Sequence, residues 1–177
     1  MKQNHFPEIK IIRLLLRKLK KSDWEMISYL RSDKEVNKFV KRPAAGSKEK
    51  ALEFILKTNK DIDDQNLYYW VITEKNKSEM IGSICLWNFS QDQKSAEAGY
   101  DLSPEFQRKG IMDESLKSVL EFGFKKLDLN IIEAYTHKNN ESSKKLLERN
   151  GFTFVRGKKD EHNQYNIIYE IKNDGEI

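Results

Sequence analysis

The residues best suited to chemistry lie between an apolar strand pattern and a helical pattern. They form the run Gln107, Arg108, Lys109, Gly110, Ile111 and Met112. The first turn of a helix has free backbone N–H groups and a partial positive charge, and Gly110 lets the backbone approach a ligand closely. Because Arg108 and Lys109 add positive charge, the run predicts a site for an anion such as a diphosphate. A solvated, charged turn is the alternative.

Periodicity in the surrounding sequence predicts the elements that position this run. Seven strands are expected, over residues 9–17, 67–75, 79–89, 94–102, 131–137, 152–157 and 165–171. Four helices are expected: one after a cap at Ser22-Asp23, one capped by Ser47, one from Ile111 to about Leu127, and one ended by Asn150-Gly151. This order predicts a single domain over residues 1–177, of the α/β or α+β class, with one central mixed sheet.

Composition limits the classes of function. The chain has 177 residues, 34% of them charged, and a net charge of only +4, which is less basic than a typical nucleic-acid domain. Residues 2–21 contain seven lysines and arginines but only one acidic residue, Glu8. Cys85 is the only cysteine, so a disulfide framework is excluded. No apolar run is long enough to span a membrane and the N-terminus is too charged for a signal peptide, so a cytoplasmic protein is expected.

Two motifs in a fixed order point to a family. The first is Gln107-Arg108-Lys109-Gly110-Ile111-Met112, and the second is Asn140-Glu141-Ser142-Ser143 followed by Gly151-Phe152. On these motifs, residues 81–157 resemble the GNAT-type acetyltransferases, and most closely the Rim-type branch of ribosomal-protein-alanine N-acetyltransferases. The first motif matches the family pattern Gln/Arg-x-x-Gly-x-Gly/Ala, except that Met112 stands where the pattern has a small residue.

The resemblance implies a fold and a cosubstrate. The family fold is a mixed sheet of about seven strands, splayed between strands four and five and flanked by about four helices. Acetyl-CoA would place its pantetheine arm in the split, against backbone groups of Tyr100, Asp101 and Leu102, and its diphosphate on residues 107–112. Asn140 would contact the pantetheine, with simple helix capping as the alternative. No metal is expected, because His5, His137 and His162 lack metal-ligand spacing.

The resemblance also suggests catalytic roles. Glu97 would accept the amine proton, directly or through water, or only attract an ammonium group; a solvent-facing glutamate is the alternative. Ser143 occupies the family position that protonates or hydrogen-bonds the leaving sulfur, and its alternative is a helix-start serine that satisfies a backbone donor. Tyr100 and Tyr135 are alternative acids.

The predicted function is transfer of an acetyl group from acetyl-CoA to a primary amine by direct attack in a ternary complex. A protein N-terminal α-amine, of the ribosomal-protein type, is the expected acceptor. One alternative is a small-molecule amine such as an antibiotic or a polyamine. Another is a non-catalytic module that binds acetyl-CoA or RNA. We expect no membrane partner, no direct nucleic-acid binding, and a monomer or homodimer.

Overall fold

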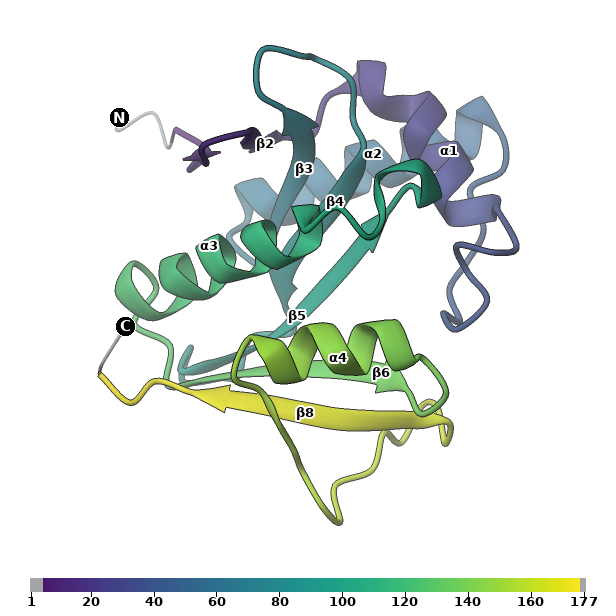
Figure 1. Ribbon diagram of the computed structural model, residues 1–177. Helices are drawn as coiled ribbons and strands as arrows, with labels where there is room; N and C mark the ends of the chain where they lie inside the picture. Colours follow the sequence, from purple (N-terminus) through teal and green to yellow (C-terminus); the bar gives the residue numbers. More distant parts are fainter. Residues whose placement is uncertain (1–4, 176–177) are drawn as a thin grey trace.

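The strands form one eight-stranded mixed sheet in a computed structural model that describes residues 5–175 (Figure 1). The strands are β1 (Ile9–Lys10), β2 (Leu14–Lys18), β3 (Tyr68–Glu74), β4 (Gly82–Trp87), β5 (Ser95–Leu102), β6 (Ile131–His137), β7 (Thr153–Phe154) and β8 (Asn166–Lys172). Their order across the sheet is β1-β2-β3-β4-β5-β6-β8-β7. Every neighbouring pair is antiparallel except β5 and β6, which run parallel.

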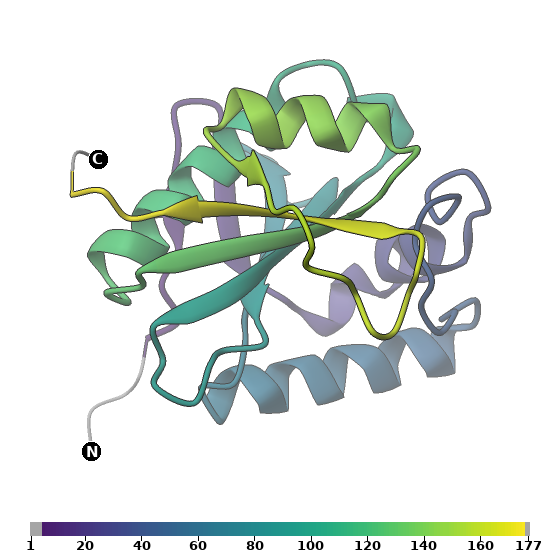
Figure 2. The ribbon, with the colours of Figure 1, turned by 90° about the horizontal axis from the view of Figure 1, so that it is seen from below.

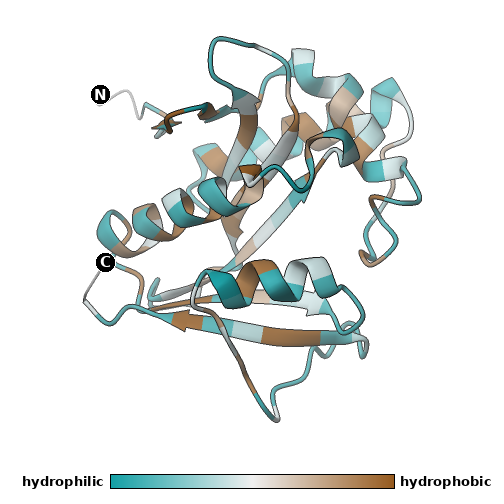
Figure 3. Cartoon of the chain, viewed as in Figure 1, coloured by the Kyte–Doolittle hydropathy of each residue, from teal (hydrophilic) through white to brown (hydrophobic). Residues whose placement is uncertain are grey.

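Four α-helices cover the two faces of this sheet. They are α1 (Trp24–Ser32), α2 (Lys48–Asp63), α3 (Ile111–Lys125) and α4 (Glu141–Arg149), with short 3-10 turns at Lys21–Asp23 and Pro104–Phe106. Helices α3 and α4 lie on one face, whereas α1 and α2 lie on the other (Figures 1 and 2). Hydrophobic and hydrophilic stretches alternate along α3, as expected for a helix with one face on the sheet (Figure 3).

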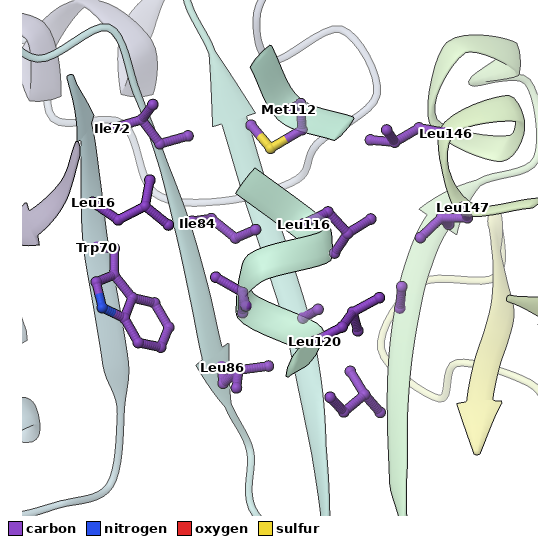
Figure 4. Packing of buried hydrophobic residues seen from close by; sticks show 14 of the residues in the cluster. Leu16, Trp70, Ile72, Ile84, Leu86, Met112, Leu116, Leu120, Leu146 and Leu147 are labelled. Carbon is purple, nitrogen blue, oxygen red and sulfur yellow. The ribbon is translucent and has the colours of Figure 1, made fainter. Parts of the chain in front are cut away.

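The larger of two hydrophobic clusters lies under α3 and α4. Trp70, Leu86 and Leu116 are fully buried there, and Figure 4 shows side chains of α3 meeting those of the strands and of α4. The smaller cluster joins Ile27 of α1 and Ala51 of α2 to the opposite face. Each face of the sheet is therefore closed by its own pair of helices.

Strands β5 and β6 pair over only half of β5. Their register runs from Ser95 opposite Ile131 to Ala98 opposite Ala134. Beyond that point residues 99–102 continue along β4, while residues 135–137 continue along β8, and the two strands diverge (Figure 1). The predicted mixed sheet with a split is confirmed. The split was predicted between strands four and five. It lies between β5 and β6 because the strand predicted over residues 9–17 is in fact two strands, β1 and β2, which shifts the numbering by one.

That N-terminal prediction was wrong in detail. Residues 9–17 do not form one strand: β1 and β2 are antiparallel partners, and Ile12 in the turn between them is 90% exposed. The apolar run has no glycine or proline to mark the turn, so periodicity alone could not reveal it. Lys2 of the basic segment lies outside the described residues.

Two predicted helix caps had different outcomes. Ser47 caps α2 as predicted, since its side chain accepts a hydrogen bond of 3.2 Å from the Lys50 backbone N–H. Asp23 stands at the N-cap of α1, but its side chain makes no capping hydrogen bond there. Its carboxylate is buried against Arg17, with N–O distances of 2.9 and 2.7 Å, because an internal cation is a stronger partner than a helix end. The strand predicted over residues 152–157 is limited to Thr153–Phe154.

Candidate active site

The loop before α3 has an unusual backbone. Arg108 and Gly110 both have positive φ, of 61° and 74°, in the left-handed region that glycine tolerates best. Residues 107–110 are exposed, and α3 begins directly after them at Ile111. Within residues 5–175, Arg108 makes no hydrogen bond or ion pair, so its guanidinium is available to an anion. Of the predicted diphosphate residues, 107–110 thus form an exposed, positively charged turn at a helix N-terminus.

Arg13, in the turn between β1 and β2, supports this loop from outside. Its Nη2 donates to the carbonyl oxygen of Lys109, and its Nε donates to Glu114 Oε1 over 2.8 Å. A Cβ atom added at Gly110 would lie 3.2 Å from Arg13 Nη2. A side chain at residue 110 would therefore be strained by the positive φ and would require the Arg13 guanidinium to shift slightly. No sequence pattern indicated this role of Arg13, since it lies in a turn that periodicity did not detect.

The other residues of the first motif have structural contacts. Ile111 and Met112 are 3% and 9% exposed, and both belong to the core under α3. Figure 4 shows the Met112 side chain there. Met112 therefore does not project over the loop, although the family pattern has a small residue there. Gln107 turns back, and its Nε2 donates to the carbonyl oxygen of Leu102 over 3.1 Å. The candidates for ligand contacts are therefore the backbone N–H groups at the start of α3 and the charged side chains of Arg108 and Lys109.

Two predicted acids meet beside the split. The hydroxyl oxygens of Tyr100 on β5 and Ser143 on α4 are 2.7 Å apart, and either can be the donor. The Asn140 side chain accepts from the Ser143 backbone N–H over 3.2 Å and so caps α4. Burial raises the pKa of Tyr100 to about 12. The structure thus combines Ser143 and its predicted alternative Tyr100 into one hydrogen-bonded pair.

Residue Asp101 has a side-chain role that the sequence did not suggest. It accepts from Ser83 Oγ over 2.6 Å and from Arg42 Nη1 over 3.0 Å. Arg42 comes from the connection between α1 and α2. Because 59 positions separate Arg42 from Asp101, no local motif could have identified the pair.

Glu97 lies on the opposite face of β5 from Tyr100, as strand alternation predicts. Its cross-strand neighbours are Trp87 on β4 and Glu133 on β6. Burial raises the pKa of Glu97 from 4.5 to about 7, and nearby carboxylates add to that shift; a hydrogen bond from Asn88 opposes it. A carboxyl group with this pKa is well matched to proton transfer near neutral pH.

The other predicted acid, Tyr135, lies away from the Tyr100–Ser143 pair. Its hydroxyl donates to Glu133 Oε2 over 3.3 Å, on the same face as Glu97. His137, at the end of β6, stacks on Tyr165 with ring centroids 5.7 Å apart and contacts the tilted ring of Phe39 at 5.2 Å. The connections α1–α2 and β7–β8 therefore meet over the end of β6.

Residues 5–175 contain no group of three or more histidine, cysteine, aspartate or glutamate side chains arranged to hold a metal ion. Across the same residues, no helix has both the length and the apolar character needed to cross a membrane.

Comparison with known proteins gives one family. The family model described as "Acetyltransferase (GNAT) domain" matches residues 13–153. The uncharacterized N-acetyltransferase YoaA of Bacillus subtilis is 31% identical over 147 residues, which cover 83% of each chain. The uncharacterized N-acetyltransferase p20 of Bacillus licheniformis is 31% identical over 140 residues, or 79% of each chain.

Solved structures share the fold at low identity. The ribosomal-protein-S5-alanine acetyltransferase of Vibrio fischeri has a TM-score of 0.80 at 24% identity, with 95% of this chain and 97% of that chain covered. RimL, a ribosomal L7/L12 alpha-N-protein acetyltransferase solved with coenzyme A, has a TM-score of 0.80 at 19% identity, with 94% and 98% covered.

Proposed function

Because the chain belongs to the GNAT family of acetyltransferases, we propose that it acetylates the N-terminal α-amine of a protein, with acetyl-CoA as donor. One observation carries the proposal: at the split between β5 and β6, the two faces of β5 have complementary proton-transfer groups. Glu97, with its raised pKa, is on one face, and the Tyr100–Ser143 pair is on the other. An amine and a thioester that meet in the split would each have a proton-transfer partner.

The residues around the split suit the donor. The exposed turn at Arg108–Gly110 and the start of α3 offer positive charge and free N–H groups to a diphosphate. Among residues 5–175, no strand pairs with residues 99–102 on the β6 side, and such an edge can bind an extended amide chain by main-chain hydrogen bonds. We therefore assign the diphosphate to the loop and the pantetheine arm to this edge of β5.

In the proposed reaction, acetyl-CoA, when bound, supplies an acetyl group activated as a thioester. Glu97 accepts one proton from the acceptor's ammonium, directly or through water, and later releases it to solvent. The neutral nitrogen then forms a bond to the acetyl carbon as the carbon–sulfur bond breaks. Ser143 donates a proton to the departing sulfur, with Tyr100 as its relay. The second proton that the nitrogen loses restores this pair, so one proton is released for each acetyl group transferred.

The choice of a protein N-terminus rests on the fold neighbours. The Vibrio fischeri enzyme and RimL are both named for ribosomal-protein acceptors. Their identity to this chain is below 25%, so the acceptor stays a proposal. The test is release of free thiol from acetyl-CoA with a panel of acceptors: peptides that copy ribosomal-protein N-termini, polyamines and aminoglycosides. Release that requires a peptide supports the proposal. Thiol release that occurs only with a small amine would make that amine the acceptor in place of a protein N-terminus. Acetyl-CoA binding without any thiol release would indicate a binding module.

A further inference from the structure

Charged residues gather on the face of β5 and β6 that carries Glu97. Glu97 and Glu133 are cross-strand partners, so their side chains leave the same face of neighbouring strands, about 4.8 Å apart at the backbone. Lys158, from the connection between β7 and β8, forms an ion pair with Glu133. In Figures 1 and 2 this connection lies on the side of the sheet opposite α4.

The groups around Glu97 include two carboxylates and one lysine. They come from β4 and its end, from β6, and from the β7–β8 connection: Cys85, Asn88, Glu133, Tyr135, Lys158 and Asp160. Glu133 and Asp160 raise the pKa of Glu97, whereas Lys158 lowers it. Lys158 thus pairs with Glu133 while Glu97 and Asp160 add negative charge nearby, and a second cation would be stabilised at this place.

We propose that Glu133 binds the acceptor's ammonium, and that the Lys158 ammonium occupies that position until the acceptor arrives. The inference rests on the proposed function, and it adds a binding residue and an internal competitor to the Glu97 site. An ammonium on Glu133 is placed beside Glu97, where its proton can leave. The acceptor class is therefore an amine that arrives charged.

The Lys158 contact is suited to displacement. Its side chain is 43% exposed and comes from an irregular connection, whereas the Glu133 side chain is 19% exposed and belongs to a central strand. Partly exposed ion pairs contribute little net stability, so an incoming ammonium can replace the lysine at small cost. The Tyr135 hydroxyl, 3.3 Å from Glu133 Oε2, holds the carboxylate in place during the exchange.

The test is binding of an alanine-initiated peptide amide, measured by calorimetry with coenzyme A present, so that no turnover is needed. K158M keeps the aliphatic stem and removes the competing charge, and we expect its peptide Kd to fall between about two- and fivefold. E133Q should raise the Kd by at least as much. In the E133Q background, K158M should give no further gain, because the two residues act on one position. K159M, the same charge change one residue along, is the matched control.

The outcomes separate this inference from the proposed function. Three results overturn the inference: weaker peptide binding by K158M, an equal effect of K159M, or unchanged peptide binding by E133Q. Each leaves the proposed function standing as long as the wild type still releases thiol. No thiol release by the wild type with any acceptor overturns the proposed function and the inference with it. Should E133Q fail to fold, E133D takes its place, since it keeps the charge but shortens its reach. E133D should weaken peptide binding, and adding K158M to E133D should change its peptide Kd. Unchanged peptide binding by E133D would again overturn the inference.

Discussion

The hydroxyl oxygens of Tyr100 and Ser143 lie 2.7 Å apart, although 43 positions separate the two residues in the chain. Tyr100 comes from β5 where β6 has parted from it, and Ser143 comes from the first turn of α4. Burial raises the pKa of Tyr100 to about 12, so the phenol stays protonated at neutral pH. The tyrosine can therefore return a proton to the serine.

Removing the Ser143 hydroxyl should affect chemistry more than donor binding. S143A should lower turnover by about a hundredfold, the usual contribution of a positioned acid, while the Kd for acetyl-CoA stays within about twofold. Y100F keeps the ring and loses only the relay hydroxyl, so its turnover should fall less. Steady-state kinetics and calorimetric titration measure the two quantities. Wild-type turnover in S143A would mean that Ser143 has only a structural role at the start of α4.

The loop before α3 should be sensitive to any side chain at residue 110. G110A forces alanine into φ +74° and towards Arg13, which should displace N–H groups from the diphosphate. One lost charge-assisted hydrogen bond corresponds to a rise of about tenfold or more in the Kd for acetyl-CoA. Gly157 offers the control: it has φ +80° and no atom within 4 Å of an added Cβ. G157A should share the backbone strain and keep wild-type affinity; equal affinities of both variants would remove the loop from the donor site.

The Arg17–Asp23 pair should dominate the electrostatic contribution to stability. Their side chains are 6% and 4% exposed, and Arg17 also donates to the Ser78 carbonyl oxygen over 2.7 Å. D23N should lower the free energy of unfolding by about 3 to 5 kcal/mol, because it leaves a buried cation without its partner. The exposed Lys18–Asp63 pair, at 40% and 67%, is the comparison, and D63N should cost less than about 1 kcal/mol. Urea unfolding curves test both; similar losses would contradict this assignment.

How much the sequence predicted depends on whether the signal was local. The loop at residues 107–112 and the helix from Ile111 follow from local sequence and periodicity, whereas the split was implied by the family resemblance, and the structure contains all three. The pairs Arg42–Asp101 and Glu133–Lys158 join segments 59 and 25 positions apart, so only the folded sheet brings them together. For Asp23 the local pattern was misleading. Its side chain is suited to capping a helix, but in the structure it forms an ion pair with the buried Arg17.

Glu97 should reduce stability at neutral and alkaline pH. Its pKa of about 7 in the folded protein exceeds its ordinary value of 4.5. The contribution of protonated Glu97 to the free energy of unfolding is therefore fully present below pH 4.5, and it is lost as pH rises through 7. E97Q should therefore be more stable than the wild type at pH 8, by about 1 to 3 kcal/mol, and equal to it at pH 4. Denaturant unfolding at the two pH values decides this. A less stable E97Q at pH 8 would show that the carboxylate is held by a favourable partner.

The most direct test of the account is the pH dependence of kcat/KM for the wild type and E97Q, with saturating acetyl-CoA. An α-amine titrates near about 7.7 to 8.0, close to Glu97, so the acceptors should include one with an alkyl amine, which titrates near about 10.4 and stays charged throughout the range. With that acceptor the wild-type rate should rise through a midpoint near 7, the pKa of Glu97. E97Q should be slower and lack the rise. An E97Q profile that matches the wild type at every pH would contradict the account and leave water, or an amine already neutral, to manage the proton.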